Sequence, residues 1–144
     1  MWNEPDAREI RQRVATLRAD APARWGKFNA PQMVCHLTDA ARMAMGELVV
    51  PSRRLPIRYF PLKQLILYVL PFPKGAPTAP ALIGRVATTW SSELVELELA
   101  FDRFVAQRTR EAWPEHPAFG PLSRTAWGVL VYRHTDHHLR QFGA

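Results

Sequence analysis

Cysteine is almost absent from this chain: Cys35 is the only one, so no disulfide can form within the molecule. Such scarcity is typical of proteins in a reducing compartment. Long apolar runs are also missing, because the longest, residues 65–73, has about half of the ~20 residues that a membrane span requires. The first residues lack the basic start and apolar run of a secretory signal. We therefore expect a cytoplasmic protein without a membrane-spanning segment and without a membrane partner.

Acidic residues are fewer than basic ones: 13 Asp and Glu against 19 Lys and Arg give a net charge of +6. A basic surface attracts phosphate groups whatever the sequence of the nucleic acid. The arginines are scattered along the chain, however, and the densest run, residues 52–58, has no strongly basic neighbour on either side. Net charge bears on nonspecific association and not on chemistry. We therefore do not expect a nucleic-acid partner.

Strict alternation of apolar and polar residues, the pattern of a strand, persists nowhere, and no internal repeat is present. Apolar residues instead recur every three or four positions, which predicts amphipathic helices. In the third of these, the inward stripe includes Val86, Trp90 and Leu94, and acidic residues such as Glu93 lie mostly outside it. The pattern predicts four helices, over about residues 5–20, 29–48, 83–108 and 123–142.

Seven prolines fall within residues 50–80 and exclude a long helix there. A short helix over about residues 62–69 fits between them, and the rest should form an ordered crossover packed against the body. Four amphipathic helices with one long crossover predict an all-α protein, a four-helix bundle, with residues 1–144 in a single domain. A chain of 144 residues buries roughly 70% of its unfolded surface, so a bound metal would serve function rather than folding.

Three of the five histidines fall within residues 134–138, inside the last predicted helix. His134 and His138 are four positions apart, so both imidazoles project from the same side of the helix. His36 interrupts the apolar face of the second predicted helix, and bundles build metal sites from side chains on facing helices. The three histidines are therefore candidate ligands of one divalent ion. The alternative is that each is a core histidine satisfied by one hydrogen bond.

Other polar residues stand close to these histidines in the sequence. Asp39 lies one helical turn after His36 and could accept a hydrogen bond from the outer N–H of a ligand, or could simply be solvated. Gln141 lies one turn beyond His138 and could orient a ligand or a bound water. His137 is ~100° around the helix from His138, which suits a supporting group or an interface residue better than a ligand.

Three further residues are considered for the site. His116 lies in a predicted loop and could approach the open side of the site, although a surface position is the alternative. Cys35 is ~100° around its helix from His36, which favours a small buried side chain over a catalytic thiol. Arg140, like Arg42 and the arginines of residues 53–58, could bind a substrate carboxylate. No residue can be named as catalytic beyond the candidate ligands.

The histidine pattern resembles a known family. Residues 134–141, His-Thr-Asp-His-His-Leu-Arg-Gln, resemble the C-terminal His-x-x-His-His-x-x-Gln pattern of the DinB-like (YfiT-like) superfamily of metal-dependent four-helix bundles. Residues 33–37 are similar to that family's helix with a single histidine. A branch mostly labelled domain of unknown function is similar over nearly the whole chain, including residues 25–28, 73–75, 116–120 and 136–143.

The resemblance implies an up-down-down-up bundle that is often dimeric, with His36, His134 and His138 holding a divalent metal, commonly zinc or nickel. Relatives use the metal in thiol-dependent chemistry or in metal-assisted hydrolysis. We therefore expect a metal-dependent enzyme, foremost a transferase that uses a low-molecular-weight thiol and a small-molecule substrate, and a homodimer. The alternatives are a metal-assisted hydrolase and a non-catalytic metal-binding bundle with a storage, structural or stress-related role. A structural site would be closed by a fourth protein ligand.

Overall fold

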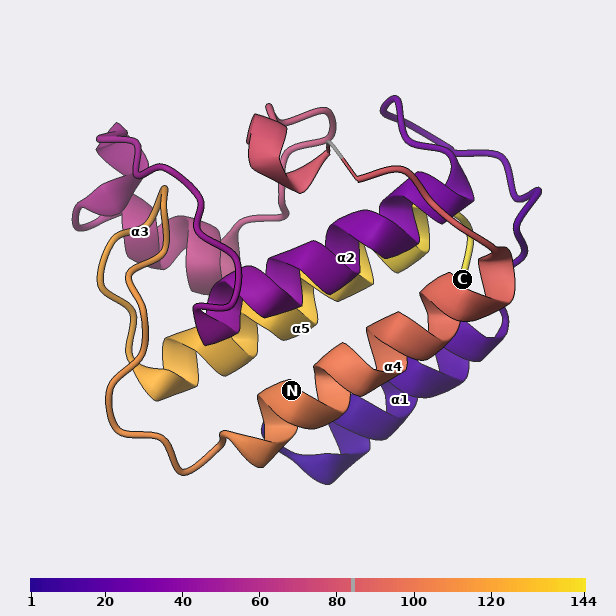
Figure 1. Cartoon of the computed structure of the whole chain (residues 1–144). Coiled ribbons are helices and arrows are strands. Elements are labelled where there is room, and N and C mark those ends of the chain that lie inside the picture. The colour runs from indigo at the N-terminus through magenta and orange to yellow at the C-terminus, as the bar shows by residue number, and fades with distance from the viewer. Residues whose placement is uncertain (84) are drawn as a thin grey trace.

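The computed structural model describes residues 1–83 and 85–144. Over these residues the chain is helical and contains no strand, which confirms the all-α class. Figure 1 shows the long helices side by side, with the segment between α2 and α4 running along the molecule from one end of the helices to the other. The long helices are α1 (Glu4–Ala15), α2 (Ala30–Met45), α4 (Trp90–Ala106) and α5 (Arg124–Gln141). No helix in the described part of the chain combines the length and the apolarity needed to cross a membrane.

Helix α1 begins as expected but is shorter than the predicted range of residues 5–20. The side chain of Asn3 accepts a hydrogen bond from the Asp6 N–H and caps the start. The helix ends at Ala15, where the Thr16 hydroxyl donates to the Arg13 carbonyl. That local bond satisfies one of the free carbonyls of the last turn and competes with continuation of the helix.

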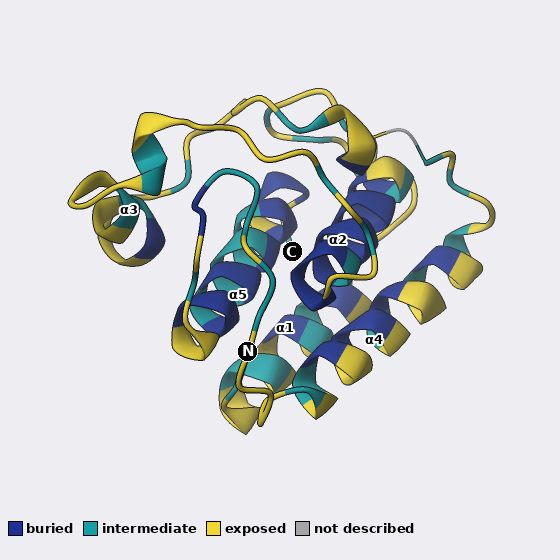
Figure 2. Cartoon of the chain, turned by 60° about the vertical axis from the view of Figure 1, so that its left-hand side comes forward, coloured by how far each residue is buried: buried dark blue, intermediate teal, exposed yellow. Residues whose placement is uncertain are grey.

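Helix α2 is the most deeply buried helix of the protein (Figure 2). Its start is fixed by a capping box, in which Asn29 and Gln32 exchange side-chain and backbone hydrogen bonds. Its end is fixed by Gly46, whose φ of +83° lies in the left-handed region that glycine adopts without strain. Both α4 and α5 pack against α2. This central position explains why thirteen of its sixteen residues, His36 and Asp39 among them, are buried.

Helix α4 begins at Trp90, not near residue 83, and residue 84 of the predicted helix lies outside the described part of the chain. Two expectations were wrong here: the Val86 side chain is 85% exposed, and Glu93 is only 1% exposed. The reason is local. The Glu93 carboxylate turns inward and accepts hydrogen bonds from the Thr88 N–H and hydroxyl and from Arg85. These bonds hold the chain before α4 in a non-helical path.

The crossover between α2 and α4 contains only short helical pieces, as its prolines predict. The expected short helix over residues 62–69 is confirmed as α3 (Leu62–Gln64) followed by the π-helical turn η2 (Leu65–Val69). Two 3₁₀ turns, η1 (Pro56–Arg58) and η3 (Pro80–Leu82), flank it. Arg133 of α5 anchors the segment by donating to the carbonyls of Ile66, Leu67 and Leu70, at 3.0, 2.6 and 2.5 Å.

The core lies between the four long helices, and α5 contributes buried apolar side chains to it, Trp127, Leu130 and Val131 among them. Ser123 caps α5 through the Ala126 N–H, and the helix ends one residue before the predicted boundary. Trp2 stacks on Phe104 at 4.5 Å between ring centroids and seals one end of the core. The largest fully buried apolar side chains are Trp127, Phe101, Phe104, Ile10, Met33, Leu37, Leu67, Leu97 and Leu139.

The loop between α4 and α5 contains His116, which predicts a pH dependence of stability. Its Nδ1 accepts the N–H groups of Ala118 and Phe119 at 3.0 and 3.1 Å, and burial lowers the pKa of the ring from 6.5 to about 4. The unfolded chain therefore binds a proton more readily than the folded chain. The free energy of unfolding should fall as the pH drops below about 6.5 and this contribution should level off below about 4.

Urea unfolding of the wild type and of His116→Asn over this pH range tests that expectation. Asparagine keeps a hydrogen-bond acceptor but cannot titrate, so the variant should lose less stability than the wild type between pH 6.5 and 4. The other histidines titrate in both proteins and cancel in the difference. Parallel pH profiles for the two proteins would contradict the assignment.

Candidate metal centre

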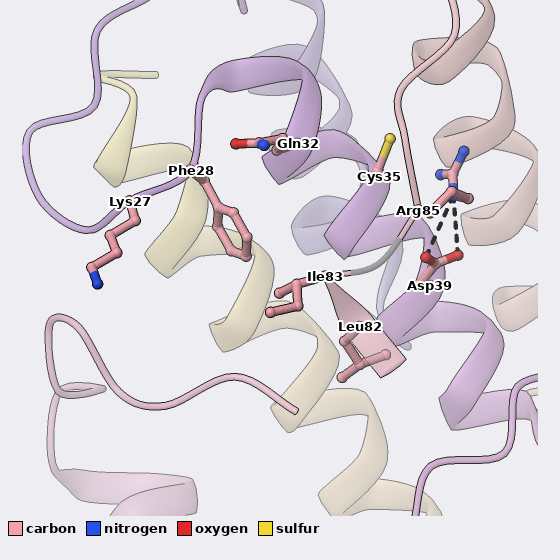
Figure 3. A pocket seen from close by; sticks show the side chains of 8 residues that line it. All are labelled: Lys27, Phe28, Gln32, Cys35, Asp39, Leu82, Ile83 and Arg85. Carbon is pink, nitrogen blue, oxygen red and sulfur yellow. Dashed lines mark hydrogen bonds and ion pairs between the residues drawn. The ribbon is translucent and has the colours of Figure 1, made fainter. Parts of the chain in front are cut away.

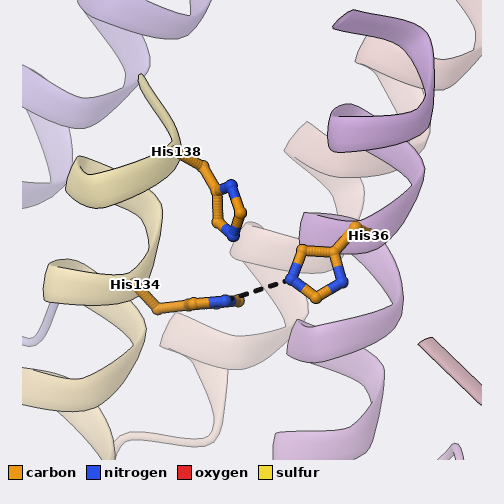
Figure 4. A group of neighbouring side chains, drawn as sticks. All are labelled: His36, His134 and His138. Atoms are coloured by element: carbon orange, nitrogen blue, oxygen red, sulfur yellow. Dashed lines mark hydrogen bonds between the residues drawn. The ribbon is translucent and has the colours of Figure 1, made fainter. Parts of the chain in front are cut away.

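Three imidazoles from two neighbouring helices converge in the interior of the protein (Figure 4). His36 projects from α2, and His134 and His138 project from successive turns of α5. One ring nitrogen of each residue lies within 4.8 Å of the other two, and the Nε2 atoms of His36 and His134 are 3.1 Å apart. These three side chains, which we call the histidine triad, could hold a metal ion.

The outer nitrogens of two of these rings are fixed by hydrogen bonds. The Nδ1–H of His36 donates to the Leu82 carbonyl at 3.1 Å, and the Nδ1–H of His138 donates to Oε1 of Gln141 at 2.7 Å. Carbonyl and amide oxygens can only accept, so the proton resides on Nδ1 and the lone pair on Nε2. Such a partner on the outer nitrogen is the usual support of a histidine that binds a metal.

The triad is kept neutral by its surroundings. Burial lowers the pKa of all three rings, and the neighbouring imidazoles lower it further for His134 and His138; that of His138 falls to about 3. Metal binding needs the unprotonated ring, and these rings are unprotonated near neutral pH. The Nε2 of His36 accepts a hydrogen bond from the Nε2–H of His134 at 3.1 Å, and a cation that displaces this proton would be bound by both nitrogens.

The donor set suits a small divalent ion. Imidazole nitrogens bind zinc at about 2.0–2.1 Å, and a tetrahedral arrangement then places the donor nitrogens about 3.3 Å from one another. The closest pair in the triad, at 3.1 Å, already meets that spacing. The other distances between the three nitrogens are at most 4.8 Å. Side-chain rotation can therefore bring the three nitrogens to the spacing of a zinc site. Imidazole also suits nickel, copper and iron, so the residues fit a divalent transition metal.

The connector between α1 and α2, residues 24–28, covers one side of the triad. The Phe28 ring lies 5.1 Å from that of His36 and 6.0 Å from that of His138, measured between centroids. Gln141 holds the connector in place, because its Nε2 donates to the Trp25 carbonyl at 2.6 Å. Gly26 passes so close that a Cβ there would lie 2.7 Å from the same Nε2, at a φ of +79°. Gln141 therefore orients His138 and the cover together.

For Asp39 the sequence left two places open, beside an outer nitrogen of the triad or in solvent, and the buried carboxylate occupies neither. Its carboxylate forms ion pairs with Arg85 at 3.4 Å and Arg42 at 3.5 Å. The Leu82 carbonyl binds the outer nitrogen of His36 instead. Asp39 thus helps to hold the segment that carries Leu82, while it does not itself hydrogen-bond a ring of the triad.

The remaining candidates lie around the triad rather than in it. His137 is half-buried, with its ring 5.5 Å from Trp25 and 5.3 Å from His138 between centroids. His116 points its Nδ1 at two loop amides, as described above. Arg140 is exposed and pairs with Asp136 at 2.9 Å.

Cys35 is buried on α2, as expected of a small core side chain. Burial and the Glu93 carboxylate raise the pKa of its thiol to about 12. A thiol with such a pKa is almost wholly protonated near neutral pH, and the thiolate is the nucleophile. Cys35 is therefore poorly suited to act as a catalytic nucleophile.

A cavity of about 210 Å³ opens beside the triad (Figure 3). Phe28 and Leu82 line it, and both also contact His36. The other walls are mostly polar, and they come from the connector, from α2 and from the segment before α4. They are Lys27, Gln32, Cys35, Asp39, Ile83 and Arg85.

Two contacts of His36, with Leu82 and with Phe28, were not predicted from helical spacing. Leu82 acts through its backbone carbonyl, and a backbone group leaves no trace in the choice of side chain. Phe28 belongs to a connector whose path could not be derived from helical periodicity.

Comparison of the chain with protein-family models, with curated proteins and with solved structures finds no match.

The bond between Gln141 and His138 predicts a measurable loss of metal affinity on substitution. Replacing Gln141 with alanine removes the acceptor of the Nδ1–H, so the affinity for zinc should fall by about 10- to 100-fold. Competition of the protein with a chromophoric chelator measures that affinity. The matched control is Gln12→Ala, at an exposed position of α1, which should bind zinc like the wild type. An unchanged affinity in folded Gln141→Ala protein would refute the supporting role.

Proposed function

We propose that this protein is a metal-dependent enzyme of the DinB-like type, in which His36, His134 and His138 hold a divalent ion, zinc or nickel. The observation that carries the proposal is the convergence of three neutral imidazoles, two of which have their outer nitrogens held by hydrogen bonds. A hydrogen bond between His36 and His134 alone would not require the ring of His138 to converge on the same point. The proposed arrangement of the chain is a four-helix bundle with up-down-down-up topology.

Contacts between helix ends support that topology. Helices α1 and α5 run in the same direction, because the Met1 amine donates to the Gly128 carbonyl at 3.2 Å and Arg13 pairs with Asp136 at 2.8 Å. Helices α2 and α4 also run in one direction. Asp39, past the middle of α2, and Glu93, near the start of α4, share Arg85. Glu47, just beyond the end of α2, pairs with Arg103 near the end of α4, at 3.6 Å.

The two pairs run in opposite directions. Trp2, just before α1, stacks on Phe104 near the end of α4, and Arg11 pairs with Glu98 closer to the middle of that helix, at 2.8 Å. These contacts support the proposed up, down, down, up order for α1, α2, α4 and α5. This order supports the family proposal, which rests on the resemblance of the histidine pattern.

A coordination position left open distinguishes an enzyme from a structural site. Within the described residues, no Asp, Glu, Cys or further His joins the triad. Asp39 is engaged by two arginines, and His116 is engaged by the amides of its own loop. Three protein ligands leave at least one position for an exchangeable group, as in catalytic zinc sites. This arrangement favours catalysis over the non-catalytic alternative.

A bound divalent ion supplies Lewis acidity, which lowers the pKa of a thiol or a water molecule and makes it a nucleophile near neutral pH. The protein's own residues prepare the site for this chemistry. The Leu82 carbonyl and Gln141 orient the ligand rings, and Phe28 excludes water from one side. The cavity next to Phe28 has room for part of a small substrate.

The reaction that we propose is the transfer of sulfur from a low-molecular-weight thiol to a small electrophilic substrate, in a cytoplasmic homodimer. Lys27 lines the cavity beside the triad and supplies positive charge for a carboxylate, whereas Arg85 is already paired with Asp39 and Glu93. Three neutral ligands leave the full charge of the ion available to stabilise a thiolate. Metal-assisted hydrolysis is the second candidate, because the same open position accepts water.

Metal content tests the site itself. We expect the purified protein to contain about one equivalent of zinc or nickel per chain by elemental analysis, and His138→Ala to lose it. The matched control is His137→Ala, which removes the neighbouring imidazole but none of the three candidate ligands. A wild type that contains no metal, and takes up neither zinc nor nickel on titration, would refute the proposal.

Activity separates the two enzymatic candidates. Loaded protein should convert a model electrophile only in the presence of an added thiol, with loss of free thiol and no turnover by His138→Ala. Turnover without thiol would replace the transferase by the hydrolase. Metal binding without any turnover across a panel of thiols and electrophiles would support the non-catalytic alternative.

A further inference from the structure

The net positive charge of this protein arises in one segment, because that segment contains no acidic residue. Between Glu47 and Glu93 the sequence contains no acidic residue, whereas six basic residues fall there. The other 13 basic residues are balanced by the 13 acidic ones, so residues 48–92 carry the whole net charge of +6. This asymmetry arises from the absence of acidic residues and is invisible when the arginines alone are traced along the chain. The basic residues are Arg53, Arg54, Arg58, Lys63, Lys74 and Arg85.

Four of these six basic residues are free of ion pairs. Arg58 pairs with Glu115, and Arg85 pairs with Asp39 and Glu93. Arg53, Arg54, Lys63 and Lys74 have no acidic partner within 4.0 Å among the described residues, and both arginines are exposed. Lys63 donates to the Pro121 carbonyl at 3.1 Å and Lys74 lies over the Trp25 ring. The charge of Arg53 and Arg54 is therefore the most available to an external partner.

The same segment exposes large apolar side chains. Phe60 is 81% exposed and Val69 is 67% exposed, and Leu62, Leu65 and Tyr68 follow one another at helical spacing between them. Of the thirteen large apolar side chains that are exposed in the described residues, eleven lie between Val49 and Val86. We call residues 53–70 the crossover surface. Its exposed apolar members are Leu55, Tyr59, Phe60, Leu62, Leu65, Tyr68, Val69 and Leu70.

The crossover surface is held in a fixed position on the protein. Arg133 of α5 binds three carbonyls of the segment, and Leu67, only 1% exposed, anchors it to the core. Figure 2 shows α3 at the edge of the molecule, where its outer side and much of the neighbouring chain are exposed. The apolar side chains therefore point outward because the inward positions are already filled.

We propose that the crossover surface docks onto an anionic lipid membrane. An interfacial helix with aromatic and aliphatic side chains on one face and basic residues beside it lies in the plane of the membrane, with its apolar face in the headgroup region. Arginine and lysine next to that face attract anionic headgroups. The inference is independent of the metal site. It is compatible with the lack of a spanning helix, since surface binding needs none.

Charge and side-chain chemistry favour this occupant over two others. A second copy docked through the same surface would bring like charges together, because the segment has no acidic residue to oppose them. A nucleic acid would satisfy the cations, but Leu62, Leu65 and Val69 would gain little from phosphate and sugar. A membrane surface satisfies both the basic and the apolar side chains.

Flotation of the full chain with lipid vesicles tests the proposal. The protein should bind mixed phosphatidylserine–phosphatidylcholine vesicles, and binding should weaken with pure phosphatidylcholine and at high salt. Phe60→Ser/Val69→Ser should lower the partition coefficient by about tenfold or more. Val95→Ser/Leu99→Ser, on the exposed face of α4, is the matched control and should bind like the wild type.

A charge variant covers the case in which the apolar variant folds poorly. Each basic residue near an anionic surface contributes about fivefold to partitioning, so Arg53→Glu/Arg54→Glu should weaken binding by about 25-fold or more. Arg18→Glu/Arg108→Glu makes the same change in net charge at exposed positions elsewhere and should have a much smaller effect.

The proposal would be overturned if the wild type did not bind the mixed vesicles. It would also be overturned if the surface variants bound the vesicles as well as their controls do. A dimer that dissociates in Phe60→Ser/Val69→Ser, without vesicle binding by the wild type, would assign the surface to a second copy. Binding of a DNA or RNA oligonucleotide, again without vesicle binding, would assign it to nucleic acid.

Discussion

Burial of three imidazole rings between α2 and α5 is the constraint around which this structure is organised. The Nε2 lone pair of His36 lies 3.1 Å from the Nε2 of His134, and either the N–H of the neutral His134 ring or a cation can satisfy it. Desolvation lowers the pKa of each ring, so an additional proton is disfavoured and the rings stay able to bind a cation. The outer nitrogens of His36 and His138 are already bound by Leu82 and Gln141, so these two rings cannot turn away without losing hydrogen bonds. A divalent cation at this place would be bound by all three rings.

The structure around the triad follows from the need to hold those outer partners. Leu82 lies at the end of the crossover, and its position depends on Arg85, which binds Asp39 of α2 and Glu93 of α4. Although burial of the Glu93 carboxylate opposes its ionisation, hydrogen bonds from Thr88, Cys35 and Arg85 lower its pKa to about 2. The buried carboxylate therefore remains charged and keeps its arginine. This cluster links the start of α4 to the back of the metal centre.

Much of this arrangement could be predicted from the sequence, because helical periodicity and caps are local. The four long helices and the short helix at residues 62–69 were predicted from spacing. The start of α4 was not, because the hydrogen bonds from Arg85 and Thr88 to Glu93 leave no mark in the helical periodicity. The spacing of His134 and His138 indicated the site, and the fold brought His36 to it. Leu82 could not be found in advance, since it contributes only a backbone oxygen.

Three histidines that hold a divalent metal should leave one coordination position open to a thiol. X-ray absorption spectroscopy of the zinc-loaded protein measures this coordination shell. We expect about three imidazole nitrogens at about 2.0–2.1 Å with a light atom completing the shell, and a sulfur at about 2.3 Å only after a thiol is added. A shell of four protein ligands that does not change on addition of thiol would refute the three-histidine site.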